Sequence, residues 1–186
     1  MWMLALILGC GATDAPIASK PTEPTKDLRS SALQFPGDSP LAQFVPKGKP
    51  AQLTGPLGAL RLGMPEADAR RVATGIANPI RRPPDFDIAP GIKGVAGMLE
   101  GFDHVGFVAI VEGGAVTQID VSAPLGYWDG VLETAWGPTE TVRLPAGNPG
   151  ARWKDADANL IVTFTNAGDG KAAVKWEPLD PALPVP

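Results

Sequence analysis

The chain has 186 residues, a formal net charge of −4 at pH 7, a single cysteine and a single histidine. An acidic balance gives no electrostatic support for binding nucleic acid, which requires Lys and Arg to neutralise phosphates. One cysteine excludes an internal disulfide, and one histidine excludes a multi-histidine zinc site. We therefore expect no nucleic-acid partner, no metal and no cofactor.

An apolar run, Trp2 to Leu8, precedes Gly9 and Cys10. It is much shorter than the ~20 residues that a membrane-spanning helix needs, but it has the length of a signal-peptide core. A short apolar run, a small residue and then a cysteine resemble the signal of bacterial lipoproteins. The resemblance implies that residues 1–9 are removed and that Cys10 carries the lipid that anchors the protein to a membrane. The alternatives are a plain secretory peptide or a buried strand with an incidental cysteine.

Residues 10–53 are predicted to be the lipidated cysteine followed by a Pro-rich tether. Such a segment cannot bury enough apolar surface to offset its chain entropy. Four apolar residues depart from this pattern, and they either dock on the folded part or form a contact site for a partner: Phe35, Leu41, Phe44 and Val45.

A globular domain is predicted over 54–180, with a tail at 181–186. Its first helix is expected to start at Gly63-Met64-Pro65-Glu66, because proline suits the first helical turn and acidic residues complement the helix dipole. An apolar face recurs at helical spacing through Ala69, Val72, Ala73 and Ile76, and Asn78-Pro79 ends the helix. Residues 81–101, rich in Pro and Gly, are expected to form a long loop.

Residues 104–111 and 115–121 alternate in polarity around Glu112-Gly113-Gly114 and predict a β-hairpin. A second helix is then expected, capped by Asp129, with Trp136 on its buried face and Gly137-Pro138 at its end. Short strands follow at 140–144, 151–154, 160–165 and 171–176. The order of helix, strands, helix, strands predicts an α+β fold made of two helix-plus-antiparallel-meander units, with the helices on one face of a sheet.

The segment Gly58-x-Leu60-x-Leu62-Gly63-Met64-Pro65-x-x-x-Ala69 resembles the opening of the SmpA/OmlA-type outer-membrane assembly lipoproteins, and Leu132-x-x-x-Trp136-Gly137 resembles the helix end of the same unit. Tandem copies of such a unit are also similar to the β-lactamase inhibitor protein. The resemblance implies an envelope lipoprotein that binds protein. It implies no site residues.

Residues that could take part in catalysis or bind a metal are sparse. His104 lies beside Asp103, and the serine available to it after the tether is Ser122, without a nucleophile-elbow pattern. Asp155-x-Asp157-x-Asn159 matches the start of a calcium loop, but Leu160 and Asn166 replace its glycine and its bidentate glutamate, so a polar hairpin turn is favoured. Asp85 and Asp87 are two carboxylates in the expected loop that could pair as acid and base. Gly91, Gly94 and Gly97 match no phosphate loop and indicate loop flexibility or close packing.

Aromatic residues are frequent in binding sites. Trp136 is expected in the core, whereas Trp128, beside Tyr127, is expected to be partly exposed, which makes this pair the candidate binding residues. We therefore expect a non-enzymatic lipoprotein of the bacterial cell envelope, in the outer rather than the inner membrane, that binds an envelope protein or has a structural role. The alternative is an exported enzyme or enzyme accessory that uses Asp85, Asp87, Asp103 or His104.

Overall fold

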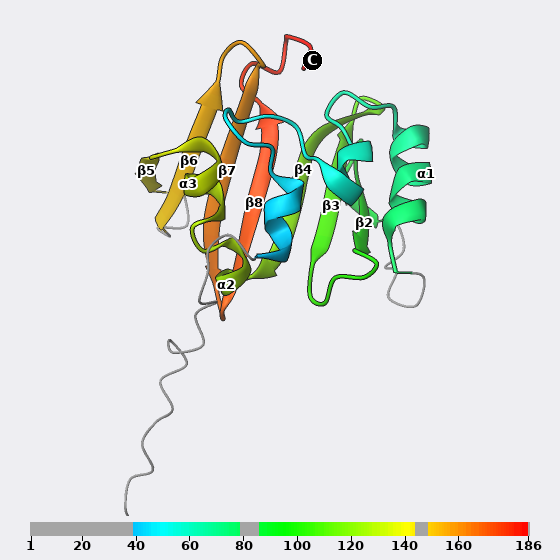
Figure 1. Ribbon diagram of the computed structural model, residues 1–186. Coiled ribbons are helices and arrows are strands. Elements are labelled where there is room, and N and C mark those ends of the chain that lie inside the picture. Colours follow the sequence, from blue (N-terminus) through cyan, green and yellow to red (C-terminus); the bar gives the residue numbers. More distant parts are fainter. Residues whose placement is uncertain (1–38, 79–85, 144–148, 186) are drawn as a thin grey trace, which may run out of the picture. The chain divides into compact units, whose positions relative to one another are not determined.

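The computed structural model describes residues 39–78, 86–143 and 149–185. Its strands form one antiparallel sheet in the order β1-β2-β3-β4-β8-β7-β6-β5 (Figure 1). The strands are β1 (Phe86–Ala89), β2 (Ile92–Met98), β3 (Gly106–Glu112), β4 (Ala115–Pro124), β5 (Glu140–Arg143), β6 (Pro149–Asp155), β7 (Leu160–Gly168) and β8 (Lys171–Pro178). The helices are α1 (Glu66–Ile76), α2 (Leu125–Trp128) and α3 (Val131–Trp136), with short 3-10 helices η3 (Pro40–Phe44) and η4 (Gly55–Ala59).

The prediction of two helix-plus-meander units is wrong, because all eight strands belong to one continuous sheet. The link is the pairing of β4 with β8, which runs from Ile119↔Trp176 to Pro124↔Lys171. The second half also lacks a helix comparable to α1, since α2 and α3 have only 4 and 6 residues. Local periodicity identifies hairpins and helices, but the β4–β8 pairing joins distant segments and leaves no local pattern.

Helix α1 confirms the prediction for this segment, with Pro65 at its N-cap and Ala69 and Ala73 buried. The prediction of a long loop over 81–101 is wrong where β1 and β2 form. Gly97 explains part of the error: a Cβ there would lie 2.7 Å from Ala77 Cβ and 2.8 Å from the Phe107 ring. The glycine that weakens the strand pattern lets the end of α1 pack closely on β2.

The second helix begins later than expected. Gly130, in the left-handed region with φ 68°, occupies the N-cap of α3, and no cap hydrogen bond comes from a side chain. Asp129 is therefore not the cap. Trp136 is half-buried rather than in the core, and its ring packs edge-on against Trp153 at 5.8 Å between centroids.

Residues 39–54, here called the N-terminal strap, are part of the fold. Leu41, Phe44 and Val45 are buried, which confirms docking rather than a free contact site; Phe35 and Cys10 lie outside the described residues. Two indole N–H groups hold the strap, from Trp136 to Pro46 O at 2.7 Å and from Trp176 to Ala51 O at 3.2 Å. The folded part therefore begins before Thr54, and the tether prediction is wrong for residues 39–53.

The C-terminal segment is also held in place. The Asn159 side chain donates to Asp180 O and Leu183 O, both at 2.9 Å, and accepts from Asp180 N at 2.7 Å. Val185 packs against the core. The described part of the predicted tail thus packs on the domain. Within the described ranges, no helix combines the length and apolar character needed to span a membrane.

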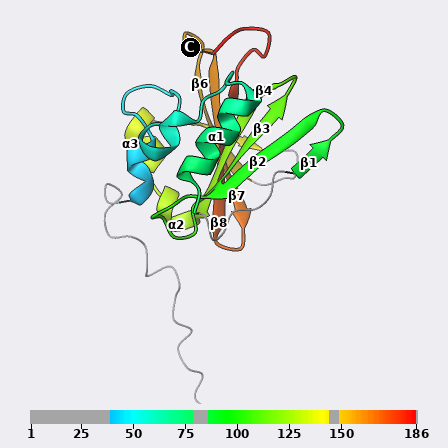
Figure 2. The ribbon, with the colours of Figure 1, turned by 90° about the vertical axis from the view of Figure 1, so that its right-hand side faces the viewer.

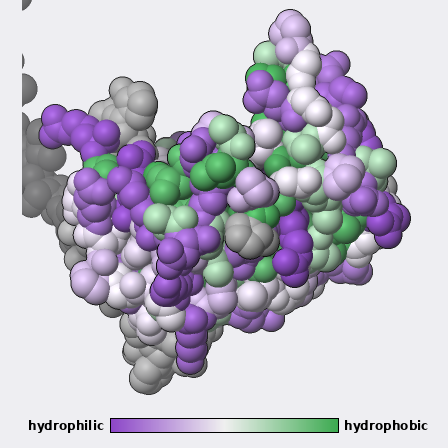
Figure 3. Space-filling model, turned by 90° about the horizontal axis from the view of Figure 1, so that it is seen from above, coloured by the Kyte–Doolittle hydropathy of each residue, from purple (hydrophilic) through white to green (hydrophobic). Residues whose placement is uncertain are grey.

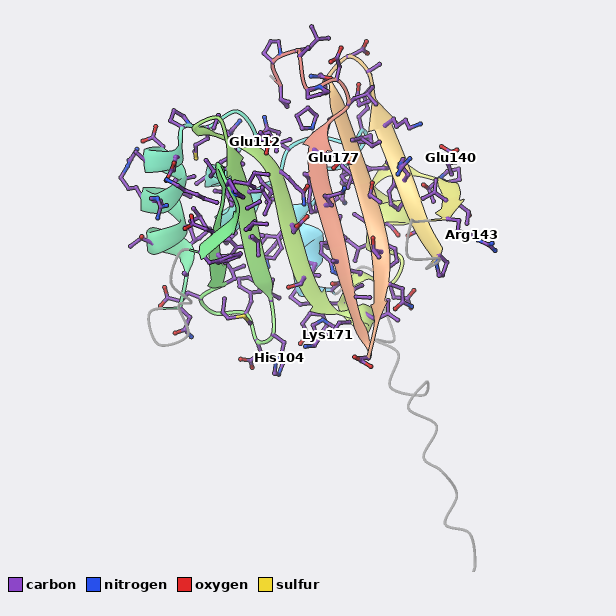
Figure 4. The ribbon with its side chains drawn as sticks, turned by 180° about the vertical axis from the view of Figure 1, so that it is seen from behind. His104, Glu112, Glu140, Arg143, Lys171 and Glu177 are labelled. Carbon is purple, nitrogen blue, oxygen red and sulfur yellow. The ribbon has the colours of Figure 1, made fainter. Side chains whose placement is uncertain are left out.

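The sheet has two different faces. The helices and the 3-10 helices lie on one side of it (Figures 1 and 2). The core of the domain lies on this side and includes the buried apolar strand residues Val121, Val162, Val174 and Trp176. The other side, seen in Figure 4, is called the open face below, because no described helix lies over it.

Candidate functional site: the open face of the sheet

The open face follows from the alternation of side chains along each strand. In β3 and β4, Phe107, Ala109, Ile119 and Val121 are buried toward the helices, so the residues between them point to the opposite side. The cross-strand register then aligns these opposite residues into rows across the sheet. One row reads Ala96, Val108, Asp120, Lys175, Thr163, Arg152 and Glu140.

The part of the open face on β1, β2 and β3 is apolar, and we call it the apolar half. Phe86 and Ile88 of the edge strand are 42% and 48% exposed. The Phe86 ring lies over Gly94, where a Cβ would come within 2.4 Å of a ring atom. The partly buried residues that continue this surface are Ala96, Met98, Val108 and Ile110.

The part on the other five strands, β4, β8, β7, β6 and β5, carries many polar residues, and we call it the charged half. Its polar residues include Gln118, Asp120, Glu140, Arg152, Lys154, Thr163, Lys175 and Glu177. Lys175 pairs with Glu177 at 2.7 Å, and Lys154 pairs with Glu140 at 3.8 Å. Figure 4 places Glu112 and Glu177 toward one end of this face and His104 and Lys171 at the other.

Asp120 is a partly buried carboxylate of the charged half. Burial raises the pKa of its carboxyl above the ordinary value of 3.8, although Gln118 Nε2 donates to both of its oxygens at 2.8 and 3.0 Å and opposes the rise. Burial therefore disfavours the ionised form of this carboxyl.

The sequence-predicted binding pair is not at this surface. Trp128 is 2% exposed and packs against Trp176 at 6.4 Å between ring centroids, so the expectation of partial exposure is wrong. It is buried because α2 packs against β4 and β8. Tyr127 is partly exposed, and its carbonyl accepts a hydrogen bond from Ser39 Oγ of the strap.

The residues of the enzyme alternative are not assembled. Asp87 pairs in register with Lys93 near the start of β2, whereas His104 follows the end of β2, so about 17 Å of strand separates these positions. Asp103 is exposed, and Asp85 lies outside the described residues.

His104 and Ser122 do line a common cavity of about 350 Å³, together with Asp169 and Lys171. The hydrogen bond of Ser122 Oγ goes to Gly106 O at 3.5 Å, and in the part of the chain that the structure describes none joins it to His104. A nucleophile needs such a contact with its base. The cavity therefore has the residue types of a catalytic triad without its geometry.

The Asp155 turn has the predicted hairpin chemistry. Asp155 Oδ1 accepts from the amides of Asp157 and Ala158 at 2.9 and 3.1 Å, as in an Asx turn, and Asn159 holds the C-terminal segment. Among the described residues, no three His, Cys, Asp or Glu side chains gather closely enough to hold a metal ion. Figure 3 shows the end of the molecule that carries this segment, where apolar and charged residues are interspersed.

The open face is not among the sites predicted from the sequence. A signal was present in the alternation of Gln118 and Asp120 with Ile119 and Val121, which was used only to predict a strand. The polar positions of 171–176 and of 151–154 carry the same signal. The pairing of β4 with β8 could not be predicted from the sequence. This pairing places the polar residues of β4 and those of the C-terminal strands on one surface.

No model of a known protein family matches the chain, and no curated protein matches its sequence. Among solved structures, the chain is similar to a cysteine-rich secretory protein from Staphylococcus aureus, with a TM-score of 0.31 and 11% sequence identity over 75% of this chain and 48% of that protein. The chain thus spans about half the length of that protein. A likeness at this level assigns neither a family nor a function.

Proposed function

We propose that this chain is a lipid-anchored protein of the bacterial cell envelope, in the outer membrane, whose domain is non-enzymatic and binds another envelope protein through the open face of its sheet. The anchor is the Cys10 of the lipoprotein-like signal. The observation that carries the binding proposal is the composition of the open face. An exposed apolar half borders a half of alternating charges.

Protein interfaces combine an apolar centre with a polar rim, and exposed apolar residues that gather on a monomer mark binding surfaces. Phe86 and Ile88 are exposed apolar residues of this kind, since both are more than two-fifths exposed on one edge strand. The ion pairs Lys175–Glu177 and Lys154–Glu140 provide charges of both signs, which favours a protein partner over an anionic surface such as nucleic acid.

Site-specific photo-crosslinking in cells tests the binding. A photoreactive residue at Ile110, in the apolar half, is expected to capture one discrete protein in the membrane fraction, identified by mass spectrometry. The matched control is Glu133, exposed on α3 on the opposite side of the sheet. If Glu133 gives the same product as Ile110, or if neither gives one, the open face is not the binding surface.

The anchor has its own test, in which cells are labelled with palmitate. The parent chain is expected to incorporate the label, and Cys10→Ser is expected to incorporate none and to leave the signal uncleaved. Equal labelling of the two chains would reject the lipid anchor without affecting the binding proposal.

A further inference from the structure

The charged half contains one arginine, Arg152, and the carboxylate opposite it on β5, Glu140, is paired with Lys154. Lys154 and Lys175 are each paired with a glutamate, but Arg152 forms no ion pair with any residue in the ranges 39–78, 86–143 and 149–185. Its Nε is buried and has no hydrogen-bond partner within the described part of the chain, whereas the residue as a whole is half-buried.

The residue opposite Arg152 on β7, Thr163, also has an unsatisfied polar atom. It is only 2% exposed, and its Oγ1 is buried without a hydrogen-bond partner among the described residues. Few buried polar groups in native proteins are left unsatisfied. Here two of them belong to residues that lie opposite each other in the register of neighbouring strands. Since the threonine hydroxyl can donate as well as accept, one acceptor that reaches both would satisfy both.

We propose that Arg152 and Thr163 form the receptor for a carboxylate, supplied by an acidic side chain of the protein partner. This inference rests on the proposed function and specifies the chemistry of its partner. A carboxylate matches the planar guanidinium, which can donate two parallel hydrogen bonds to it. The Thr163 hydroxyl can donate to the same group, which reaches it only when the Arg152 side chain moves, because Thr163 is buried and Arg152 is half-buried.

The alternative anion, a phosphate on a lipid headgroup, fits less well. Phosphate binding and membrane attraction rely on several unpaired cations, since each of them adds to the attraction near an anionic surface. On the open face Lys154 and Lys175 are already paired, and Lys171 lies at the other end of the face. Glu140 lies opposite Arg152 on β5, and Glu177 lies two residues from Lys175 on β8. This arrangement accepts a single negative charge better than a doubly charged phosphate.

Nuclear magnetic resonance tests the receptor directly. The full chain, held in detergent and labelled with nitrogen-15 in arginine, is titrated with a short oligoglutamate peptide with blocked ends. The Nε–H resonance of Arg152 is expected to shift and saturate. In Arg152→Lys the peptide should bind at least about tenfold more weakly, a difference of about 1.4 kcal/mol.

Three variants control this measurement. Arg143→Lys, which removes an exposed arginine from the neighbouring strand β5, should leave peptide affinity unchanged. Thr163→Ser should keep the affinity and Thr163→Val should lower it. The proposal is overturned if the Arg152 resonance does not move at millimolar peptide, or if Arg143→Lys weakens binding as much as Arg152→Lys.

Competition experiments with phosphate distinguish a carboxylate site from a phosphate site. Inorganic phosphate and vesicles containing phosphatidylglycerol are expected neither to displace the peptide nor to shift the Arg152 resonance. Displacement by either would reassign the site to phosphate. The crosslink from Ile110 is independent of these results: a crosslink that persists in Arg152→Lys with no peptide binding rejects the carboxylate receptor alone, whereas peptide binding without a crosslink rejects the proposed function.

Discussion

Glu66 at the start of α1 accepts a hydrogen bond from Lys93 Nζ of β2 at 3.1 Å, and so ties the helix to the sheet. The same carboxylate accepts from Arg70 one turn further along the helix, at 2.8 and 3.0 Å. The hydrogen bond from Arg70 first, and then that from Lys93, hold the pKa of Glu66 below its ordinary value of 4.5.

A lowered pKa in the folded state means that Glu66 stabilises the fold above its unfolded pKa, and that this contribution disappears as the pH falls through the folded value. Glu66→Gln should therefore lower the melting temperature at pH 7, and the difference from the parent should shrink below pH 4.5. Thermal melts across this range check it. Asp68→Asn is the matched control and should have a smaller effect, since within the described residues Asp68 pairs only with the exposed Arg71.

The contribution of Asp120 to stability should depend on pH with the opposite sign. Burial raises its pKa in the folded state, so the ionised carboxylate costs stability above the folded pKa, and this cost is absent below the unfolded value of 3.8. Asp120→Asn should raise the melting temperature at pH 7 and leave it unchanged well below pH 3.8. A lower melting temperature at pH 7 would mean that the contact with Gln118 outweighs desolvation.

The N-terminal strap should be necessary for folding. Leu41, Phe44 and Val45 are all buried, and each buried side chain of this size contributes about 1.5–3 kcal/mol. Their sum is comparable to the total stability of a domain, about 5–15 kcal/mol. A fragment that begins at Ala51 should therefore unfold without a cooperative transition, while one that begins at Ala32 should show a sharp one in urea. Equal urea midpoints would show that the strap is dispensable.

Two glycines of β2 should differ in their tolerance of a side chain. Gly97→Ala places its Cβ against Ala77 and Phe107, which are both buried, and overpacking of this kind costs about 1–3 kcal/mol. Gly94→Ala meets only the ring of Phe86, which is exposed enough to move away. Urea unfolding should show a clear loss of stability for Gly97→Ala and little for Gly94→Ala; equal losses would contradict the packing described for Gly97.

Short-range patterns in the sequence were enough to predict α1, the β3–β4 hairpin and the strands of the C-terminal half. In each case a turn or cap residue bounds a run of regular apolar spacing: Pro65 before α1, Gly113-Gly114 within the hairpin, and the Asp155 turn between β6 and β7. These signals act over a few residues. They need no information about the rest of the chain.

The tertiary structure alone decided what these elements build. The β4–β8 pairing joins two sets of strands into one sheet, the strap covers the buried face through the indoles of Trp136 and Trp176, and Gly97 is a strand residue because α1 packs on it. The open face has the same origin, since the juxtaposition of Arg152 and Thr163 arises from cross-strand register. Contacts between residues far apart in the chain determine these features, because apolar burial and strand pairing depend on which surfaces meet and not on local spacing.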